Sequence, residues 1–421
     1  MKESIKKRIE AVRRGEVPEG YKRTDSGVIP EEWPNSTIGK IIAFHSEKST
    51  INNEYPVLTS ARSGLVLQTE YFEDQVTREE NAGYNVIPYG YVTYRSRSDN
   101  GRFTFNQNQI IEKGIVSCFY PVFRIIEDLA DPTFVLSYLN NYLGRQIVKE
   151  IVGTSQLVLS EKKLSELRLP CPPLAEQQKI AKILATCDRV IELKQQLLKE
   201  KRRQKQWLMQ KLLDPNSGVR LPGFEGSQWT KCRIGDLADI YSGGTPDTNI
   251  ESFWDGGVLW CTPSDITCAG KYIDRTETTI SELGLQKSSA ALMPVGSVLM
   301  CSRATIGPRS IAKVPIATNQ GFKNFICKET VYNEFLYYAL ETILPDLLKK
   351  AAGNTFKEVS KSDLSNSMID IPGLDEQKAI ASWLIMADRD IELCEQELEA
   401  WQQKKKALMQ LLLTGLVRVN A

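Results

Sequence analysis

One segment of about 40 residues occurs twice in this chain, and this repeat limits the possible folds more than any other feature. Residues 172–213 and 372–413 align without a gap, and 20 of the 42 positions are identical. A shorter match lies upstream of each copy, where Trp33 corresponds to Trp229. Self-similarity of this kind indicates two copies of one structural unit. The other segments differ, so variable and repeated parts alternate along the chain.

The repeated segment is predicted to form a helix of about 40 residues, or roughly 60 Å. Pro172 and Pro173 stand where the first copy would begin, and a missing N–H costs little in a first turn. Apolar side chains then recur with heptad spacing. The apolar positions expected to pair the helices and to dock other subunits are Ile180, Leu184, Ile191, Leu198, Leu208 and Leu212 in the first copy, and Ile380, Leu384, Ile391, Leu398, Trp401, Leu408 and Leu412 in the second.

A long helix with one apolar stripe needs a partner, and the two copies are the natural pair. Antiparallel packing would bring Ile180 close to Leu412. The basic run 199–205 would then face the acidic residues of 388–392, and residues 404–406 would face Asp188 and Glu192. The alternatives are that each helix packs only on its own domain, or that the basic run binds DNA phosphates. The side chains of Trp207, Trp383 and Trp401 are expected to pack within the helix pair or against a partner.

The variable segments are predicted to be rich in β-structure. Runs such as "GIVSCFYPVFRI" and "GSVLMCSRATIG" combine β-branched or aromatic residues with bounding Gly, Pro, Asn and Ser. The predicted fold is therefore α+β, with two globular β-rich domains, two long antiparallel helices in a coiled coil, and a pseudo-two-fold internal repeat. The expected segments are 1–30 (N-terminal segment), 31–170 (first domain), 171–214 (first long helix), 215–370 (second domain) and 371–421 (second long helix and C-terminal segment).

Composition argues against several classes of protein. His45 is the only histidine and the nine cysteines are scattered singly, which disfavours metal sites, His-based catalysis and a disulfide framework. Neither a nucleotide-binding P-loop nor the N/D-P-P-F/Y tetrapeptide of amino-methyltransferases is found. The set Asp188, Glu192 and Lys194 has the residue types of a nuclease site but lies along one helix. We expect a cytoplasmic, non-catalytic chain with no metal and no membrane segment.

The order of these segments resembles the specificity subunit of type I restriction–modification systems over essentially the whole chain. The resemblance rests on "LPCPPLAEQQKIAKIL" and "IDIPGLDEQKAIASWL", each followed by D-R-x-I-E-L and later by L-M-Q-x-L-L. In the second variable segment, "YSGGTPDT", "LWCTPSDI", "SRATIGP" and "ATNQGFK" are similar to parts of the family's target recognition domains. The first variable segment is less typical and resembles a different recognition subclass.

The resemblance implies that each variable domain reads one half of a bipartite site in double-stranded DNA. The helix pair would set the unread gap between the half-sites, roughly 5–8 bp. Two methyltransferase subunits would dock on the helices, and restriction (translocase) subunits would join the complex. This chain would carry no cofactor, whereas S-adenosylmethionine, ATP and Mg would bind the partner subunits. Two readers multiply specificity, because each wrong base pair costs about 1–3 kcal/mol.

Candidate DNA contacts are polar residues in the loops of both domains. Arginine can bind guanine and Asn or Gln can bind adenine through paired hydrogen bonds, whereas Lys more often binds phosphate. Loop Asn and Ser residues can equally serve only to shape turns. The candidates are Arg62, Arg95, Arg97, Arg102 and Asn106 in the first domain, and Thr245, Ser264, Asp265, Arg303, Asn319, Gln320 and Lys323 in the second.

Two other functions remain open at this point. The chain could be a coiled-coil adaptor whose domains bind proteins, since its net charge is only +1. It could also direct a different defence complex to DNA. One structural expectation follows from the repeat alone: residues 2–15 should pack beside residues 411–419, which would complete a pseudo-circular arrangement.

Overall fold

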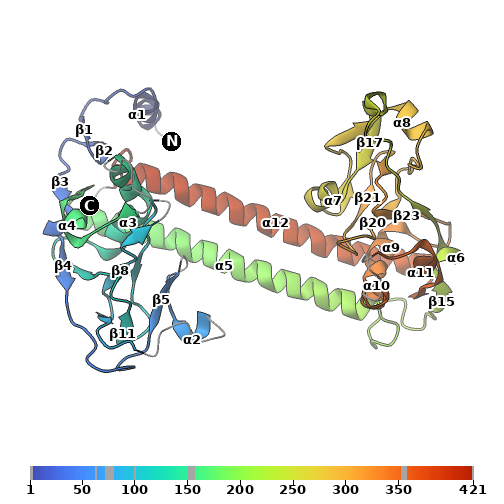
Figure 1. Cartoon of the computed structure of the whole chain (residues 1–421), viewed down its shortest axis with the longest axis horizontal. Helices are drawn as coiled ribbons and strands as arrows, with labels where there is room; N and C mark the ends of the chain where they lie inside the picture. The colour runs from blue at the N-terminus through green and yellow to red at the C-terminus, as the bar shows by residue number, and fades with distance from the viewer. Residues whose placement is uncertain are drawn as a thin grey trace. The chain divides into compact units, whose positions relative to one another are not determined.

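The computed structural model describes residues 3–61, 64–71, 80–98, 101–149, 157–351 and 358–419. The chain divides into two compact units (Figure 1). Unit 1 contains Met1–Gln195 and Glu397–Ala421, and unit 2 contains Gln196–Gln396. The two long helices, α5 (Leu174–Leu212) and α12 (Leu374–Leu412), each contribute residues to both units. Each unit therefore combines one β-rich head with a stretch of both helices.

The long helices run antiparallel within each unit, as the repeat predicts. In unit 2, Lys201 pairs with Asp390 at 2.6 Å, and Lys205 pairs with Asp388 at 2.5 Å. Residue numbers on one helix rise as those on the other fall, which defines an antiparallel register. In unit 1, Lys405 pairs with Asp188 in the same register. The alternative of two independent helices is therefore wrong.

The apolar stripe lies where the heptad pattern predicts. In unit 1, Ile180 and Leu412 belong to one core, and in unit 2 Leu212 and Ile380 belong to another. Of the predicted stripe residues, those that are buried are Ile180, Leu184, Leu198, Leu212, Ile380, Leu384 and Leu412, and those that are partly buried are Ile191, Leu208, Ile391, Leu398, Trp401 and Leu408. The helix–helix contact uses these side chains, so they present little surface to other subunits.

The two alternatives expected for Trp207 and Trp383 can be separated. They are 49% and 48% exposed, so they do not pack within the helix pair, and packing against a partner stays a prediction. One ion pair differs from expectation, because Arg203 pairs with Glu200 of its own helix at 3.0 Å and not with an acidic residue of α12.

The head of unit 1 is built on a four-stranded antiparallel sheet of order β10-β8-β12-β4. Helix α3 (Pro132–Lys149) packs against it, with Phe134 and Tyr138 in the same core as Phe105 and Phe123. The sheet strands are β4 (Ile42–His45), β8 (Val92–Tyr94), β10 (Phe105–Gln107) and β12 (Val122–Ile125). The other elements are α1 (Glu3–Arg13), β1 (Tyr21–Thr24), β2 (Gly27–Pro30), β3 (Asn35–Thr37), η1 (Ile38–Lys40), β5 (Leu58–Ala61), β6 (Gly64–Leu67), α2 (Gln68–Tyr71), β7 (Asn85–Pro88), β9 (Arg97–Ser98), β11 (Lys113–Val116), β13 (Leu157–Val158), α4 (Glu161–Glu166) and β14 (Arg168–Pro170).

The head of unit 2 contains a five-stranded sheet of order β16-β23-β20-β21-β18 and a three-stranded sheet of order β19-β17-β22. The strands of the two sheets are β16 (Ala238–Ser242), β17 (Trp254–Cys261), β18 (Tyr272–Ile273), β19 (Thr278–Ile280), β20 (Val298–Cys301), β21 (Arg309–Ala312), β22 (Ala317–Thr318) and β23 (Phe322–Cys327). The remaining elements are β15 (Thr230–Arg233), α6 (Ile234–Leu237), η2 (Glu251–Phe253), α7 (Pro263–Ala269), α8 (Glu282–Gln286), α9 (Asn333–Ala339), η3 (Leu340–Ile343), α10 (Leu344–Ala351), α11 (Lys361–Asn366) and β24 (Met368–Ile371).

The central strands of the two heads correspond despite their different sequences. Chain order and pairing match β4 with β16, β8 with β20, β10 with β21, and β12 with β23. The register agrees as well, since Phe123 pairs with Val92 and Phe325 pairs with Val298. The repeat therefore extends into the heads as a shared backbone arrangement.

Small residues at the base of each head make close contacts that explain why these positions are the same in both copies of the repeat. A Cβ added to Gly39 would lie 2.9 Å from Ser165 Cβ, and one added to Gly235 would lie 2.1 Å from Ser365 Oγ. Ser160 and Ser360 cap the short helices α4 and α11 by accepting backbone N–H groups. These contacts fix the short helix in the same place in each unit.

Replacing Gly39 by alanine is expected to lower the free energy of unfolding by about 1–3 kcal/mol, because the new methyl group overlaps both the side chain and the backbone of Ser165. Gly144 provides the matched control within the same unit, since it lies in α3 and a Cβ there meets nothing within 4 Å. Gly144→Ala should stabilise the helix by about 0.5–1 kcal/mol. Urea unfolding curves measure both values. Equal effects of the two substitutions would contradict the close approach at Gly39.

Candidate nucleic-acid interface

Each long helix is fixed to its head by a buried Glu–Gln pair in its first turn. Gln177 Oε1 accepts the backbone N–H of Asp131 at 3.0 Å, and its amide donates to the carbonyl of Pro172 at 2.8 Å. Gln377 repeats both contacts with Tyr332 and Pro372, at 2.8 and 2.9 Å. Asp131 and Tyr332 directly precede α3 and α9, helices that pack on the two head sheets. Each glutamine therefore joins its long helix to the start of that helix.

The neighbouring glutamates accept the indole N–H of the two repeated tryptophans. Trp33 Nε1 donates to Glu176 at 3.3 Å, and Trp229 Nε1 donates to Glu376 at 3.4 Å. Both carboxylates are almost fully buried. Burial raises the pKa of Glu176, although hydrogen bonds from the backbone of Val419 and from Trp33 act in the opposite direction.

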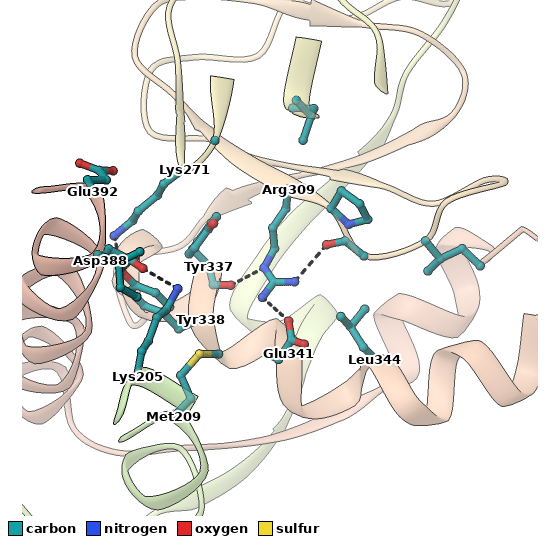
Figure 2. A pocket seen from close by; sticks show the side chains of 16 residues that line it. Lys205, Met209, Lys271, Arg309, Tyr337, Tyr338, Glu341, Leu344, Asp388 and Glu392 are labelled. Carbon is teal, nitrogen blue, oxygen red and sulfur yellow. Dashed lines mark hydrogen bonds and ion pairs between the residues drawn. The ribbon is translucent and has the colours of Figure 1, made fainter. Parts of the chain in front are cut away.

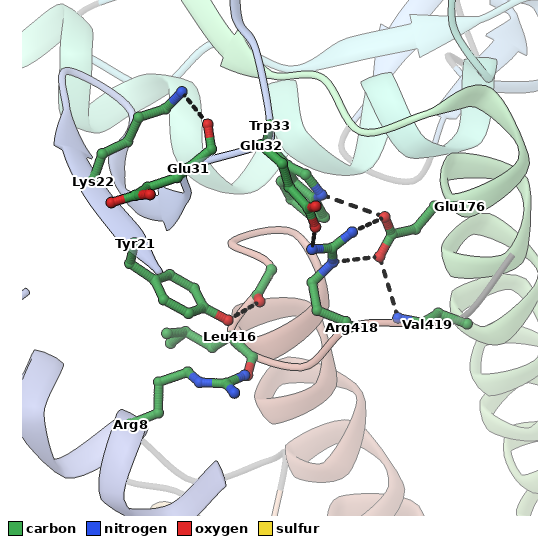
Figure 3. A network of polar contacts seen from close by, with 11 residues as sticks. Arg8, Tyr21, Lys22, Glu31, Glu32, Trp33, Glu176, Leu416, Arg418 and Val419 are labelled. Carbon is green, nitrogen blue, oxygen red and sulfur yellow. Dashed lines mark hydrogen bonds and ion pairs between the residues drawn. The ribbon is translucent and has the colours of Figure 1, made fainter. Parts of the chain in front are cut away.

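The chain terminus completes the anchor of unit 1 (Figure 3). The guanidinium of Arg418 donates to both oxygens of Glu176 at 2.7 and 2.8 Å, and its carbon lies 5.2 Å from the centre of the Trp33 ring. In unit 2 the linker residue Arg220 lies 5.2 Å from the centre of the Trp229 ring. The C-terminal tail in unit 1 therefore takes the place that the central linker occupies in unit 2.

The N-terminal segment also reaches this region, as the repeat predicts. Arg8 Nη1 donates to the carbonyl of Leu416 at 2.7 Å, and the hydroxyl of Tyr21 donates to the carbonyl of Gly415 at 2.8 Å (Figure 3). The expected proximity of residues 2–15 to residues 411–419 is thus seen in the contact of Arg8. Both ends of the chain are held in unit 1.

In unit 2 a polar network joins the head to both long helices beside a cavity of about 640 Å³ (Figure 2). Lys271 Nζ donates to the hydroxyl of Tyr338 at 2.8 Å and pairs with Glu334 at 2.7 Å. Tyr338 in turn donates to the carboxylate of Asp388 on α12, which also pairs with Lys205 on α5. Burial lowers the pKa of Lys271 and raises that of Tyr338. Because these lysines are paired, the network serves to hold the head on the helices.

Four sequence motifs of the unit 2 head meet at one end of its sheets. The backbone N–H of Gly244 donates to Thr318 O at 2.9 Å, which joins "GGTP" to "ATNQGFK". The N–H of Asn319 donates to Cys261 O at 3.0 Å, and the N–H of Ser302 donates to Gly321 O at 2.8 Å. The turn formed by residues 319–321 is therefore the point where "LWCTPSDI" and "SRATIGP" also converge.

Several predicted contact residues of unit 2 are accessible around this turn. Arg303 and Gln320 are exposed, and the hydroxyl of Thr245 donates to the side-chain oxygen of Gln320. Asn319 Oδ1 accepts the N–H of Gly321 at 2.9 Å, so only its amide group remains to donate elsewhere. Ser264 is exposed on α7, in the "TPSDI" motif. These side chains form one polar surface at the motif junction.

Three predicted contact residues instead have structural roles. The carboxylate of Asp265 caps α7, accepting the N–H and hydroxyl of Thr262 at 2.8 and 2.7 Å. Lys323 is only 5% exposed and pairs with Glu358 at 3.3 Å. Asn106 is 8% exposed and donates to Ser60 and Ala61, at 2.8 and 2.9 Å, which fixes hairpin β5–β6 to β10. The polar groups of these three residues are engaged in hydrogen bonds or an ion pair within the heads, so the candidate surface consists of the other residues.

The arginines of unit 1 lie at the matching end of its sheet. Arg95 and Arg97 follow β8 and are exposed, as is Arg102, while Arg62 lies outside the described residues. Ser96 O accepts the N–H of Leu159 at 2.8 Å, just as Ser302 O accepts that of Val359 at 2.9 Å. The residue after each serine therefore occupies an equivalent position in the two heads, so Arg97 corresponds to Arg303.

One further correspondence between the heads was not predicted from the sequence. Ser96 N–H donates to Phe119 O at 3.2 Å, where Ser302 N–H donates to the carbonyl of Gly321. The turn of residues 117–120 in unit 1 thus occupies the place of the turn 319–322 in unit 2. Nothing in "SCFY" resembles "NQGF" apart from the final aromatic residue, so only strand register identifies the match.

Comparison with known proteins agrees with this duplicated architecture. A family model described as "Type I restriction modification DNA specificity domain" matches residues 30–201 and again residues 226–401. The chain belongs to this family. Each match spans one head and most of the long helix that follows it, which is the division expected from the repeat.

Individual relatives are similar over part or all of the chain. The MjaIX specificity subunit of Methanocaldococcus jannaschii is 39% identical over 167 residues, which covers 39% of each chain. The putative MjaX specificity subunit of the same organism is 26% identical and covers 96% of this chain and 97% of that protein. The solved type I S subunit from M. genitalium has a similar fold, with a TM-score of 0.54, 16% identity and coverage of 90% of this chain and 96% of that one.

Within the part of the chain that the structure describes, no helix is long and apolar enough to cross a membrane. The same residues contain no group of three or more His, Cys, Asp or Glu side chains placed to hold a metal ion.

Replacing Gln377 by methionine should destabilise unit 2 by at least about 2 kcal/mol, because the substitution leaves the buried N–H of Tyr332 and the carbonyls of Pro372 and Thr330 without their side-chain partner. The neighbouring Lys378 is exposed, so Lys378→Met is the matched control and should change stability by less than about 0.5 kcal/mol. Thermal unfolding followed by circular dichroism measures both. Similar melting temperatures for the two variants would show that the glutamine is not an anchor.

Proposed function

We propose that this chain is the DNA-specificity subunit of a type I restriction–modification complex and that each head reads one half of a bipartite site in double-stranded DNA. The observation that carries the proposal is the equivalence of Arg97 and Arg303. Both are exposed and lie at the same backbone position in two heads whose sequences otherwise differ. Two family matches, one over each head, favour this function over that of a coiled-coil adaptor.

The chemistry of the exposed residues suits base reading. Arginine can donate two hydrogen bonds to guanine O6 and N7 in the major groove, and a glutamine amide can pair with adenine. In unit 2 the candidates for these roles are Arg303 and Gln320, with Thr245, Ser264 and the amide of Asn319 beside them. In unit 1 they are Arg95, Arg97 and Arg102. Different side chains on one backbone frame would give each head its own half-site.

We assign the spacing of the half-sites to the helix pair. Helices α5 and α12 each have 39 residues, or about 58 Å at 1.5 Å per residue. Their ion pairs and apolar stripe fix one register in each unit. A pair that cannot slide would keep the unread gap constant, at roughly 5–8 bp.

The outer surface of the helix pair is suited to docking two methyltransferase subunits. The large apolar side chains exposed on it include Leu193, Leu197, Trp207, Trp383, Met386 and Leu393. In this proposal the chain performs no catalysis, and S-adenosylmethionine, ATP and Mg bind the methyltransferase and restriction subunits. Repeated helices would offer related surfaces to two copies of the same partner.

Arg303→Ala should relax base preference in one half-site only, since removing a bidentate contact costs about 1–3 kcal/mol of discrimination. The measurement is methylation profiling of DNA from cells that express the chain with its methyltransferase subunit. Arg233→Ala is the control, because Arg233 is an exposed arginine on β15, away from the motif junction. If Arg303→Ala altered both half-sites, the two heads would not be independent readers.

Deleting one heptad from each long helix, at residues 189–195 and 389–395, should shorten the unread gap or prevent assembly. Removing seven residues from both helices preserves the heptad phase and shortens each helix by roughly 10 Å. Methylation profiling gives the gap directly, and gel filtration with the methyltransferase subunit reports assembly. An unchanged gap in an assembled complex would refute the role of the helices in spacing.

A further inference from the structure

The turn at residues 117–120 in unit 1 has the same construction as the turn at 319–322 in unit 2. The N–H of Tyr120 donates to Ser117 O at 2.9 Å, as the N–H of Phe322 donates to Asn319 O at 3.3 Å. In unit 1 the hydroxyl of Ser117 accepts the N–H of Phe119, the third residue of the turn, at 3.5 Å. In unit 2 the Oδ1 of Asn319 accepts the N–H of Gly321, also the third residue, at 2.9 Å. The two turns are therefore equivalent parts of the two heads.

The third position of this turn differs in size and polarity between the two heads. Unit 2 has Gly321 there, whereas unit 1 has Phe119, whose side chain is 55% exposed. The guanidinium carbon of Arg97 lies 5.0 Å from the centre of the Phe119 ring. A single exposed aromatic side chain is ordinary on a protein surface, so it is the contact with Arg97 that sets Phe119 apart. This contact with a candidate reading arginine points to DNA as the partner of the ring.

An arginine stacked on an aromatic ring is held in a limited set of directions, which lowers the entropy lost when it binds a base. The ring edge can at the same time contact the 5-methyl group of thymine, the one apolar feature that the major groove presents. A glycine at the same position can do neither. The two heads would then read bases by different means from one backbone frame.

We propose that Phe119 is a specificity-determining residue of the unit 1 head. Its ring contacts a thymine methyl group in the half-site read by unit 1 and directs Arg97 to a neighbouring base. This inference rests on the proposed function, so its test must separate the two.

The first experiment determines the methylated target with the full chain and its methyltransferase subunit for wild type, Phe119→Ala and Tyr89→Ala. Tyr89 is the matched control: it is 60% exposed in the same head but precedes β8, whereas Arg97 follows it. Phe119→Ala should relax one or two positions of one half-site and leave the other half-site unchanged. Tyr89→Ala should alter neither. The unchanged half-site also shows that the variant is folded.

The second experiment replaces each thymine of that half-site by uracil, which lacks the methyl group, and measures binding of the assembled complex. At one position the replacement should weaken wild-type binding by roughly three- to fivefold and have no effect on Phe119→Ala. Phe119→Leu should retain part of the effect, since leucine is also apolar.

The outcomes separate the two hypotheses. If the wild-type complex modifies no bipartite target, the proposed function fails. If it does, but Phe119→Ala leaves the target unchanged or weakens both half-sites equally, only the role of Phe119 fails. The inference is also overturned if no thymine-to-uracil replacement in this half-site weakens binding by the wild type while leaving binding by Phe119→Ala unchanged.

Discussion

The buried Glu–Gln pair at the start of each long helix is the interaction on which the rest of the structure depends. The glutamine makes hydrogen bonds with backbone groups of the head, and the glutamate accepts the indole N–H of a tryptophan near the N-terminal start of the head. A buried polar group left without such a partner costs about 1–3 kcal/mol, so these contacts specify one docking position. Because the first turn of each long helix is fixed, the apolar heptad stripe of that helix can face the partner helix in one orientation only.

The same anchor is covered by different segments in the two units. In unit 2 the segment that covers the anchor is continuous linker, and Ser227 donates to Glu376 at 2.5 Å. In unit 1 the covering segment is supplied by both ends of the chain, through Arg8 and Arg418. Burial lowers the pKa of the partly buried Arg418 guanidinium, which pairs with the buried carboxylate of Glu176.

Sequence reasoning predicted the features that follow from periodicity and failed where only side-chain environment decides. The helix bounds, their antiparallel register and the contact of Ile180 and Leu412 in one core follow from heptad spacing and from opposite charges at matching positions. Residue type alone could not show that Asp265 caps a helix or that Lys323 is buried with Glu358, because capping, ion pairing and base reading use the same groups. The equivalence of the turn that contains Phe119 to the turn of "NQGF" was not predicted, because the two turns share a backbone arrangement but almost no side chains.

These failures and successes have one physical origin. The anchors act largely through backbone carbonyl and N–H groups of the heads, so they place few demands on head side chains. The turn next to Arg97 and Arg303 is likewise closed by backbone hydrogen bonds, and its third position accepts glycine or phenylalanine with the same acceptor in place. A frame held by main-chain groups leaves its surface side chains free to differ. The two heads can therefore present different chemistry from equivalent positions while the helices that join them remain nearly the same.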